Sequence, residues 1–148
     1  HFYEEELRHL AYVNWAQRLG LDVAGLVYSS GGFTVENGRE QAARLLAENE
    51  DRLPDAILVA ADPLAVGVLQ ALAAAGVRVP QDIAVVSINN QEVCRYTSPT
   101  LSSFDIDCSE LAESAILLLS DSIIGRYSSC HHVLVSTKLT VRDSFVPA

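Results

Sequence analysis

The sequence predicts an α/β protein built on a doubly wound parallel sheet. Two apolar runs, residues 56–61 ("AILVAA") and 83–88 ("IAVVSI"), lack the polar alternation of a half-exposed strand, so each is expected to be covered on both faces. Helical patterns precede and separate these runs. Strands and helices that alternate at this spacing form right-handed crossovers around a parallel sheet. With 148 residues, 49% of them hydrophobic, the chain is long enough to bury a core.

The first third of the chain predicts a helix, a strand and a second helix. Apolar residues recur near a 3.6-residue period over residues 3–19, and Gly20 then supplies a left-handed stop. Residues 22–28 ("DVAGLVY") are rich in β-formers and predict a short strand. After the loop "SSGGF", Thr34 is a plausible N-cap for the second helix, which ends before Pro54.

The third helix is the most clearly marked. Asp62 as N-cap and Pro63 as the first helical residue form a strong start signal, and the helical pattern continues to Gly76. We therefore expect the Asp62 side chain to cap the helix rather than bind a ligand. Trp15, near the apolar face of the first helix, is expected in the core.

The last third predicts a crossover, a helix and a closing strand. Residues 91–104 show no helical pattern and read as a crossover. Asp107 with Glu110 resembles a capping box, and the helix that follows ends at Gly125. Residues 132–144 ("HVLVSTKLTVRDS") alternate apolar and polar side chains, as an edge or half-exposed strand does.

The composition argues against several classes of protein. The formal net charge is −9, and the ten Lys and Arg residues form no dense cluster, so the chain itself is not expected to bind nucleic acid. No apolar run approaches the ~20 residues that cross a bilayer. Three cysteines fit a reducing compartment better than a disulfide framework, so a cytoplasmic location is expected. The chain starts at His1 and enters a helical pattern almost at once, which predicts a fragment.

Candidate ligand contacts gather where the predicted strands end. Ligands of open α/β sheets bind at the carboxyl ends of the strands. Asn89 and Asn90 follow one strand, Ala61 follows another, and the "SSGGF" loop follows a third. Asn amides both donate and accept hydrogen bonds, as sugar hydroxyls require. The same two residues could instead only build a turn.

Two further side chains, Arg8 and Phe33, could have either a ligand-binding role or a structural role. Arg8 on the first helix could hold a hydroxyl-rich or anionic ligand in its planar fork, or could simply be solvated or paired with an acid. Phe33 could stack on the apolar face of a sugar ring or pin its loop to the core. The residues alone do not separate these readings.

Signals for catalysis and for metal are weak. Residues 130–132 ("CHH") contain zinc-ligand types, but no distant pair completes four ligands, so neither a metal nor a cofactor is expected. The motifs of common hydrolases, phosphate loops and dinucleotide-binding turns are absent from the sequence. Asp105 and Asp107 are the remote candidates for acid–base chemistry. An enzyme is the weaker hypothesis.

From about Leu7 to Val146 the chain resembles the effector-binding domain of the LacI/GalR family of bacterial transcription regulators. Residues 55–90 resemble the family's long signature of strand, helix, "G-x-x-V-P-x-D-I" and strand, in the form "DAILVAADPLAVGVLQALAAAGVRVPQDIAVVSINN". "YTSPTLSSFDID" is similar to the family's crossover and "STKLTVRDS" to its closing strand. The joint occurrence of these pieces in order is highly specific, whereas any one alone is not.

The resemblance implies two doubly wound subdomains, like those of periplasmic sugar-binding proteins, with a small molecule in the cleft between them. Residues 1–100 would be the second subdomain, incomplete because its first strand is missing. Residues 101–148 would supply the crossover, helix and closing strand that belong to the first subdomain. The helix-turn-helix domain that precedes this fold in full-length regulators would lie outside the chain. The segments "LRHLAYVNW", "SINN" and "STKL" together point to repressors responsive to β-galactosides.

The resemblance also implies a ligand-binding set. The family's effector-contacting Arg falls at Arg8, and its sugar-packing aromatic falls at Phe33. The Asn of the family's Asn-Asp pair falls at Ala61, the Asp after the last strand falls at Asn89, and a polar crossover position falls at Ile106. These departures imply a pocket less polar than is usual for the family.

The function implied is the sensing of a small, sugar-like effector. Effector binding would favour one closure of the cleft and so alter the spacing of two DNA-binding heads in a homodimer on operator DNA. The family pairs through the side that carries the second helix and the "QEVCRY" loop, so Tyr96→Glu is expected to weaken self-association. The alternative is a periplasmic-type sugar-binding protein of a transporter.

Overall fold

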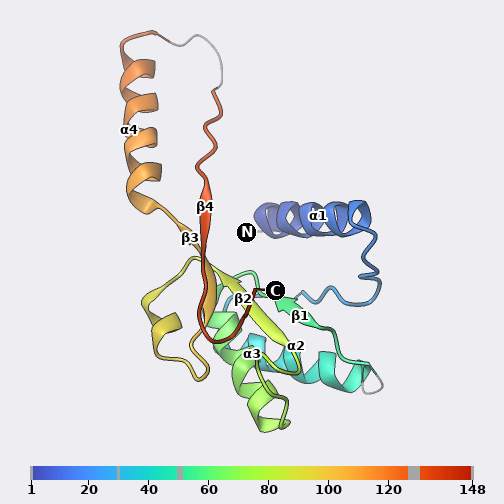
Figure 1. The fold of residues 1–148 in the computed structure, drawn as a ribbon. Coiled ribbons are helices and arrows are strands. Elements are labelled where there is room, and N and C mark those ends of the chain that lie inside the picture. The colour runs from blue at the N-terminus through green and yellow to red at the C-terminus, as the bar shows by residue number, and fades with distance from the viewer. Residues whose placement is uncertain (1, 30, 50–51, 127–130, 148) are drawn as a thin grey trace.

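A computed structural model describes residues 2–29, 31–49, 52–126 and 131–147. Along the chain the elements are α1 (Phe2–Arg18), α2 (Val35–Glu48), β1 (Ala56–Leu58), α3 (Asp62–Ala74), β2 (Ala84–Ile88), the 3-10 helix η1 (Glu92–Arg95), β3 (Ser102–Ile106), α4 (Cys108–Ile123) and β4 (Thr137–Thr140) (Figure 1). The four α-helices lie where the sequence predicts them, within one or two residues at most ends. None of the helices in the described part of the chain has the length and apolar character needed to cross a membrane.

The strands form one mixed sheet in the order β1-β2-β3-β4. β1 pairs with β2 and β2 with β3 in parallel, whereas β4 runs antiparallel to β3. The α/β class and the parallel-dominated sheet are therefore confirmed. β4 is an edge strand with exposed and half-buried side chains, as its alternating sequence predicts.

The core lies between the sheet and the pair α2 and α3. Leu72 of α3, Val85 of β2 and Leu101 before β3 are fully buried within it. α2 and α3 cross in backbone contact at two glycines: a Cβ at Gly38 would lie 2.0 Å from the Leu64 carbonyl oxygen, and a Cβ at Gly67 would lie 2.0 Å from the Val35 carbonyl oxygen. Only glycine permits this approach, so the two residues set how closely the helices pack.

The opposite face of the sheet is less covered than its apolar strands predict. Along β2, Val85 and Ser87 are buried, whereas the alternate positions Ala84, Val86 and Ile88 are only half-buried. α1 stands apart from α2 and α3, on the far side of β1 in Figure 1. Among the α1 side chains that the structure describes, residues 7–18, Ala16 is the buried one. Full cover of both strand faces was thus an incorrect expectation.

Residues 22–28 do not form the predicted strand. The Asp22 carboxylate accepts a hydrogen bond from the Ala24 N–H at 3.1 Å, and Gly25 takes a φ of 74°. The Leu26 N–H donates to the Val23 carbonyl, which closes a local turn instead of a ladder bond. Within the described residues, the outer edge of β1 therefore has no strand partner.

Two of the predicted caps form as expected. Thr34 accepts a hydrogen bond from the Asn37 N–H at 3.1 Å, which begins α2. Asp107 accepts from the N–H groups of Ser109 and Glu110, at 3.0 and 2.9 Å, which begins α4.

Two other predictions are wrong. The N-cap of α3 is Ala61, not Asp62, and it makes no side-chain cap bond. Trp15 is 60% exposed and carries the Arg18 guanidinium over its ring at 5.3 Å rather than joining the core.

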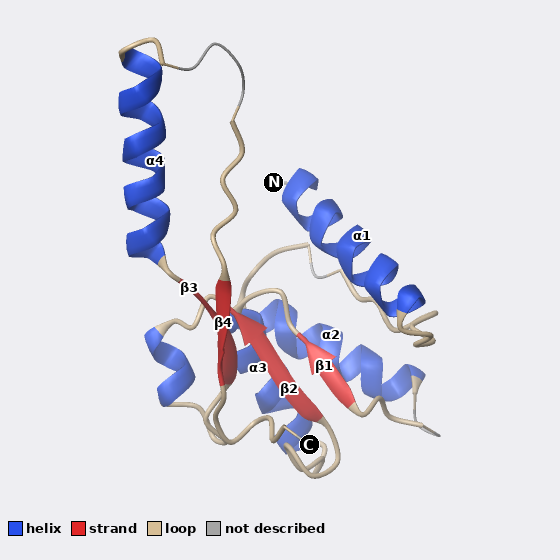
Figure 2. Cartoon of the chain, turned by 45° about the horizontal axis from the view of Figure 1, so that its top comes forward, coloured by secondary structure: helices blue, strands red, loops and turns tan. Residues whose placement is uncertain are grey.

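α4 extends away from the sheet in both views of the fold (Figures 1 and 2). The structure describes every residue of α4, and none of its side chains is buried. Its apolar residues, among them Leu111, Ile116 and Leu119, are exposed to solvent. The helix thus forms at the predicted place without the packing that its apolar pattern predicts.

Candidate ligand-binding site

A pocket of about 660 Å³ opens beside the outer edge of β1. It is bounded by α1, by residues 26–29 and Phe33, by one side of α2, and by the segment that leads from β1 into α3. Most of its lining is apolar, including Leu26, Val27, Leu45, Ile57, Val59 and Val68. Polar side chains enter it from Arg8, His9, Tyr12, Tyr28 and Gln41. A mostly apolar cavity with a few converging polar groups is typical of small-molecule sites.

Arg8 ties α1 to the end of β1. Its Nη1 donates a hydrogen bond to the Ala60 carbonyl oxygen at 3.1 Å, across 52 residues of sequence. A guanidinium carries five N–H donors in a planar fork, so this bond positions Arg8 without exhausting it. Phe33, 43% exposed, lines the same pocket. The structure thus brings Arg8 and Phe33 to the lining of one cavity.

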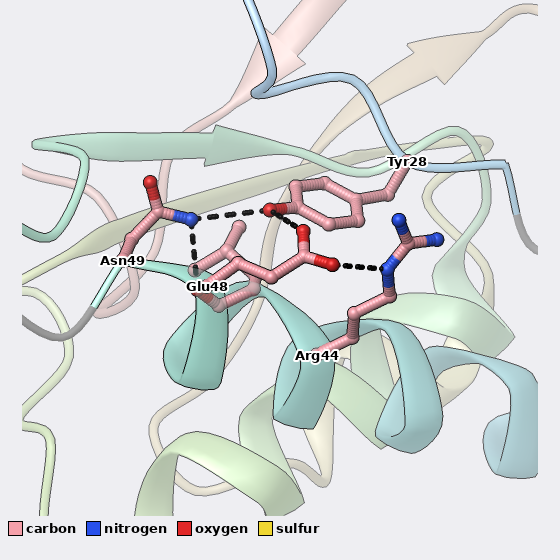
Figure 3. A network of polar contacts seen from close by, with 5 residues as sticks. Tyr28, Arg44, Glu48 and Asn49 are labelled. Atoms are coloured by element: carbon pink, nitrogen blue, oxygen red, sulfur yellow. Dashed lines mark hydrogen bonds and ion pairs between the residues drawn. The ribbon is translucent and has the colours of Figure 1, made fainter.

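Tyr28 forms part of the pocket wall, and a network of polar contacts fixes its position (Figure 3). Tyr28 Oη donates to Glu48 Oε2 at 3.0 Å and accepts from Asn49 Nδ2 at 3.1 Å. Arg44 Nε donates to Glu48 Oε1 at 2.7 Å, and its guanidinium lies 5.4 Å from the centre of the Tyr28 ring. Burial and the bond to Glu48 raise the pKa of Tyr28, whereas the Arg44 bond lowers the pKa of Glu48. The irregular segment is therefore anchored to α2 by side chains.

Ala61 contributes no polar group to the site. It is buried as the N-cap of α3, and its neighbour Ala60 lines the pocket with a carbonyl that Arg8 already engages. Ala61 itself is not among the residues that line the pocket, so the structure does not bring this predicted ligand contact to the cavity.

Asn89 and Asn90 do build a turn, and both adopt positive φ, 106° and 51°. The Asn90 side chain is engaged: its Oδ1 accepts from Arg142 Nη2 at 2.7 Å. The half-buried Asn89 side-chain amide has no hydrogen-bond partner among the residues that the structure describes. Asn89 directly follows Ile88, which lines the pocket. Neither asparagine is among the residues that line the pocket, and the two differ in that only the Asn90 side chain is bonded to Arg142.

Asp62 is a buried polar centre beneath this edge of the sheet. It accepts hydrogen bonds from the Ser87 hydroxyl, from the Ser103 hydroxyl at 2.8 Å and from the Gln91 N–H at 2.6 Å. These partners lie 25 to 41 residues away, so no local pattern could reveal them. A carboxylate bound by three donors joins α3 to β2, to β3 and to the turn that follows β2.

Sequence reasoning missed several polar residues of the pocket lining, among them Tyr28 and Gln41. Gln41 Oε1 is buried without a hydrogen-bond partner, and the side chain lines the pocket from α2. The helical period could have marked Gln41, because it lies beside Ala42 on the inward side of α2. Nothing local marks Tyr28, whose partners Glu48 and Asn49 lie about twenty residues further along.

Three groups outside the pocket bear on acid–base or nucleophilic chemistry: Cys94, Asp105 and Asp107. Burial raises the pKa of the Cys94 thiol to about 11, which disfavours the nucleophilic thiolate. Asp107 caps α4, and Asp105 lies opposite Lys138 in the β3–β4 pair. In the described ranges no three His, Cys, Asp or Glu side chains gather into a metal-binding group, and Cys130 lies outside those ranges.

Comparison with known proteins agrees with this geometry. Residues 1–145 match the family model of the periplasmic binding protein-like domain. The HTH-type transcriptional regulator LacR of Lactobacillus helveticus is 40% identical over 147 residues, which are 99% of this chain and 44% of that protein. The chain thus spans less than half the length of this relative.

Two solved structures of LacI family transcriptional regulators are similar in fold. One, from Lactobacillus casei with bound sucrose, has a TM-score of 0.77 at 25% identity, over 95% of this chain and 51% of that one. The other, from Arthrobacter sp. FB24 in complex with lactose, has a TM-score of 0.67 at 33% identity, over 75% of this chain and 41% of that one.

Proposed function

This chain belongs to the family of periplasmic binding protein-like domains, in its LacI/GalR branch of transcription regulators, and from that premise we propose that it senses a small, sugar-like effector. The signal would pass to a helix-turn-helix domain outside the 148 residues and from there to operator DNA. The proposal contains no catalytic step, and it places the protein in the cytoplasm. A periplasmic-type sugar-binding protein is the second candidate, because that class shares the fold.

The observation that carries the proposal is the pocket that Arg8 and Phe33 share along the outer edge of β1, which Ile88 at the end of β2 also lines. Arg8 offers donors to ligand hydroxyls, and Phe33 offers an apolar face to a sugar ring. Directly after β2, the Asn89 side-chain amide has no hydrogen-bond partner among the described residues and is available to a ligand. The sucrose and lactose held by the two similar regulators support a sugar as the ligand class, and lactose supports the β-galactoside subgroup.

The division of the chain is part of the proposal. We assign residues 1–100 to the second subdomain and residues 101–148 to the crossover, helix and strand that belong to the first. The buried core supports this division, because eleven of its twelve residues lie between Ala42 and Cys94, and the twelfth, Leu101, lies at the proposed boundary. The absence of any buried side chain along α4, a helix described in full, supports it as well. Effector binding would shift the population between two closures of the cleft.

A homodimer formed through α2 and the loop around η1 completes the proposal. Tyr96 in that loop is 75% exposed, and its hydroxyl donates a hydrogen bond to Glu92 of the same loop at 3.1 Å. Tyr96→Glu places a charge on this surface, so weaker self-association is expected in analytical ultracentrifugation. An unchanged sedimentation profile would remove the loop from the interface.

The test of ligand class is thermal unfolding with a panel of galactosides, glucosides and non-sugar metabolites, on a protein that includes whatever coding sequence precedes His1. A ligand at ~100 times its dissociation constant adds about 2.7 kcal/mol, enough to raise the melting temperature by several degrees. We expect a rise with one sugar class that Arg8→Ala removes. Arg126→Ala is the matched control, because Arg126 pairs with Asp121 at the far end of α4.

The outcomes separate the candidate functions. A sugar-dependent rise that survives Arg8→Ala would place the ligand elsewhere, and no rise with any sugar would exclude the proposed class. Operator binding by the same protein that changes with the sugar distinguishes a regulator from a transporter binding protein. A sugar that binds tightly without affecting DNA would favour the second candidate.

A further inference from the structure

The two amides at the end of β2 are held in an unusual backbone. Asn89 and Asn90 have φ values of 106° and 51°, in the half of conformational space that side chains with a Cβ seldom occupy. Asn tolerates such angles better than most residues. Two in succession nevertheless need support from the surrounding structure.

Three backbone N–H groups bind the turn to β3 and to α3. The Asn89 N–H donates to the Phe104 carbonyl oxygen at 2.9 Å, the Asn90 N–H to Ser103 Oγ at 3.0 Å, and the Gln91 N–H to Asp62 Oδ2 at 2.6 Å. These bonds fix where the backbone runs. They leave both asparagine side chains to be placed by other contacts.

Arg142 supplies the contact for Asn90 from 52 residues away. Its Nη2 donates to Asn90 Oδ1 at 2.7 Å, while its Nη1 donates to the Leu101 carbonyl oxygen at 2.6 Å. The Arg142 backbone is itself fixed, because its N–H donates to Ser102 Oγ at 2.7 Å and its carbonyl accepts from the same hydroxyl at 3.1 Å. Arg142 therefore spans from the start of β3 to the turn as a rigid, two-armed clamp.

We infer that Arg142 is a positioning residue for the ligand site, acting through Asn90. By holding Asn90 Oδ1 it maintains the positive-φ backbone in which Asn89, whose side chain has no hydrogen-bond partner among the described residues, directly follows the pocket-lining Ile88. Arg142 itself does not line the pocket. This inference rests on the proposed function, since it assigns a role in that same site.

The experiment compares four variants: Arg142→Gln, Asn90→Gly, the two combined, and Asn90→Asp. Glycine holds positive φ without the clamp, and aspartate keeps an acceptor for Arg142 and tolerates the same backbone. The first readout is the dissociation constant of the sugar that raises the melting temperature of the wild-type protein. The second, which needs no ligand, is amide hydrogen exchange of residues 88–92 compared with the core helix over residues 64–72.

We expect Arg142→Gln to weaken sugar binding about tenfold, because a hydrogen bond to a charged group is lost at the turn. In the Asn90→Gly background the same substitution is expected to raise the dissociation constant of the sugar less than about threefold. The Asn90→Asp protein is expected to bind the sugar about as tightly as wild type. Exchange of residues 88–92 is expected to quicken in Arg142→Gln while residues 64–72 keep their protection. Arg78→Gln, at an exposed pair with Asp82, is the control and should change neither readout.

Three results would overturn the inference. They are unchanged exchange at residues 88–92, equal losses of affinity for Arg142→Gln in both backgrounds, or faster exchange throughout the core. If Arg142→Gln does not fold, the Asn90→Gly and Asn90→Asp proteins are compared instead. The first removes the acceptor of the Arg142 hydrogen bond and the second keeps it. A wild-type protein that binds no sugar contradicts the proposed function, and the exchange measurement still decides whether Arg142 holds the turn.

Discussion

α3 and α4 were predicted from the same kind of helical pattern, yet only α3 is packed. Eight of its residues are buried, from Asp62 to Leu72, between α2 and the sheet. α4 begins at a well-formed cap and runs for 16 residues with no buried side chain. The contrast teaches that a 3.6-residue period predicts a helix and its apolar side, but not whether this chain supplies a partner for that side.

The consequence is an uneven distribution of stability. The packed region, formed by α2, α3, β1, β2 and β3, contains the whole buried cluster from Ala42 to Leu101. α1 and α4 form an outer region that keeps large apolar side chains in contact with water, including Leu10, Trp15, Ile116 and Ile123. Substitutions should therefore cost free energy of unfolding in the first region and very little in the second.

Leucine truncation gives the largest expected effect. Leu72→Ala removes a fully buried side chain of α3 and should lower the free energy of unfolding by about 2–5 kcal/mol. Leu117→Ala, at a 58% exposed position of α4, is the matched control and should change it by less than about 0.5 kcal/mol. Urea titration followed by circular dichroism measures both. Equal losses of unfolding free energy in the two variants would mean that α4 is packed in solution, and would contradict the difference between α3 and α4.

The close contact between α2 and α3 at Gly67 provides a second test of the packed region, because here a methyl group is added instead of side-chain atoms being removed. Gly67→Ala drives a methyl group into the Val35 carbonyl oxygen, so we expect a loss of about 1–3 kcal/mol although alanine favours helices. Ser120→Ala makes a similar change on the exposed surface of α4 and should be neutral or slightly stabilising. Stability measured in the same urea series decides the point. A stabilised Gly67→Ala protein would show that α2 and α3 are further apart than the structure has them.

An exposed ion pair within the packed region gives the smallest effect. Hydrogen bonds from Arg78 hold the pKa of Asp82 at about 2, below its ordinary value of 3.8. A depressed carboxyl pKa contributes stability above the unfolded value, and that contribution is lost as the pH falls through the folded value. Stability should therefore decline slightly from about pH 4 towards pH 2, less so at high salt, because the pair is solvent-exposed.

Asp82→Asn should flatten that part of the pH profile, and Arg78→Gln should have the same effect. Both variants should match wild type in thermal unfolding at pH 2. A profile that Asp82→Asn leaves unaltered would assign the acid sensitivity to other carboxylates.

Local signals also predicted part of the site. The order of strands and helices brought Ala61 and Asn89 to the carboxyl ends of neighbouring strands, and the family resemblance named Arg8 and Phe33, which line the pocket. The roles of Asn90 and Asp62 were not predictable in this way. Their partners, Arg142 and Ser103, lie 52 and 41 residues away, and several serines and arginines would have matched equally well on chemistry alone.

The sequence by itself determined the helices, their caps, the α/β class and the chemical types available at the strand ends, because period, capping residues and apolar runs act over a few neighbouring residues. Tertiary structure decided the rest. It left residues 22–28 without the neighbouring backbone that a strand requires, buried Asp62 among three donors instead of at a cap, and engaged Asn90 while leaving Asn89 unpartnered. Each of these outcomes depends on hydrogen bonds between distant segments, which form only when the sheet brings those segments together.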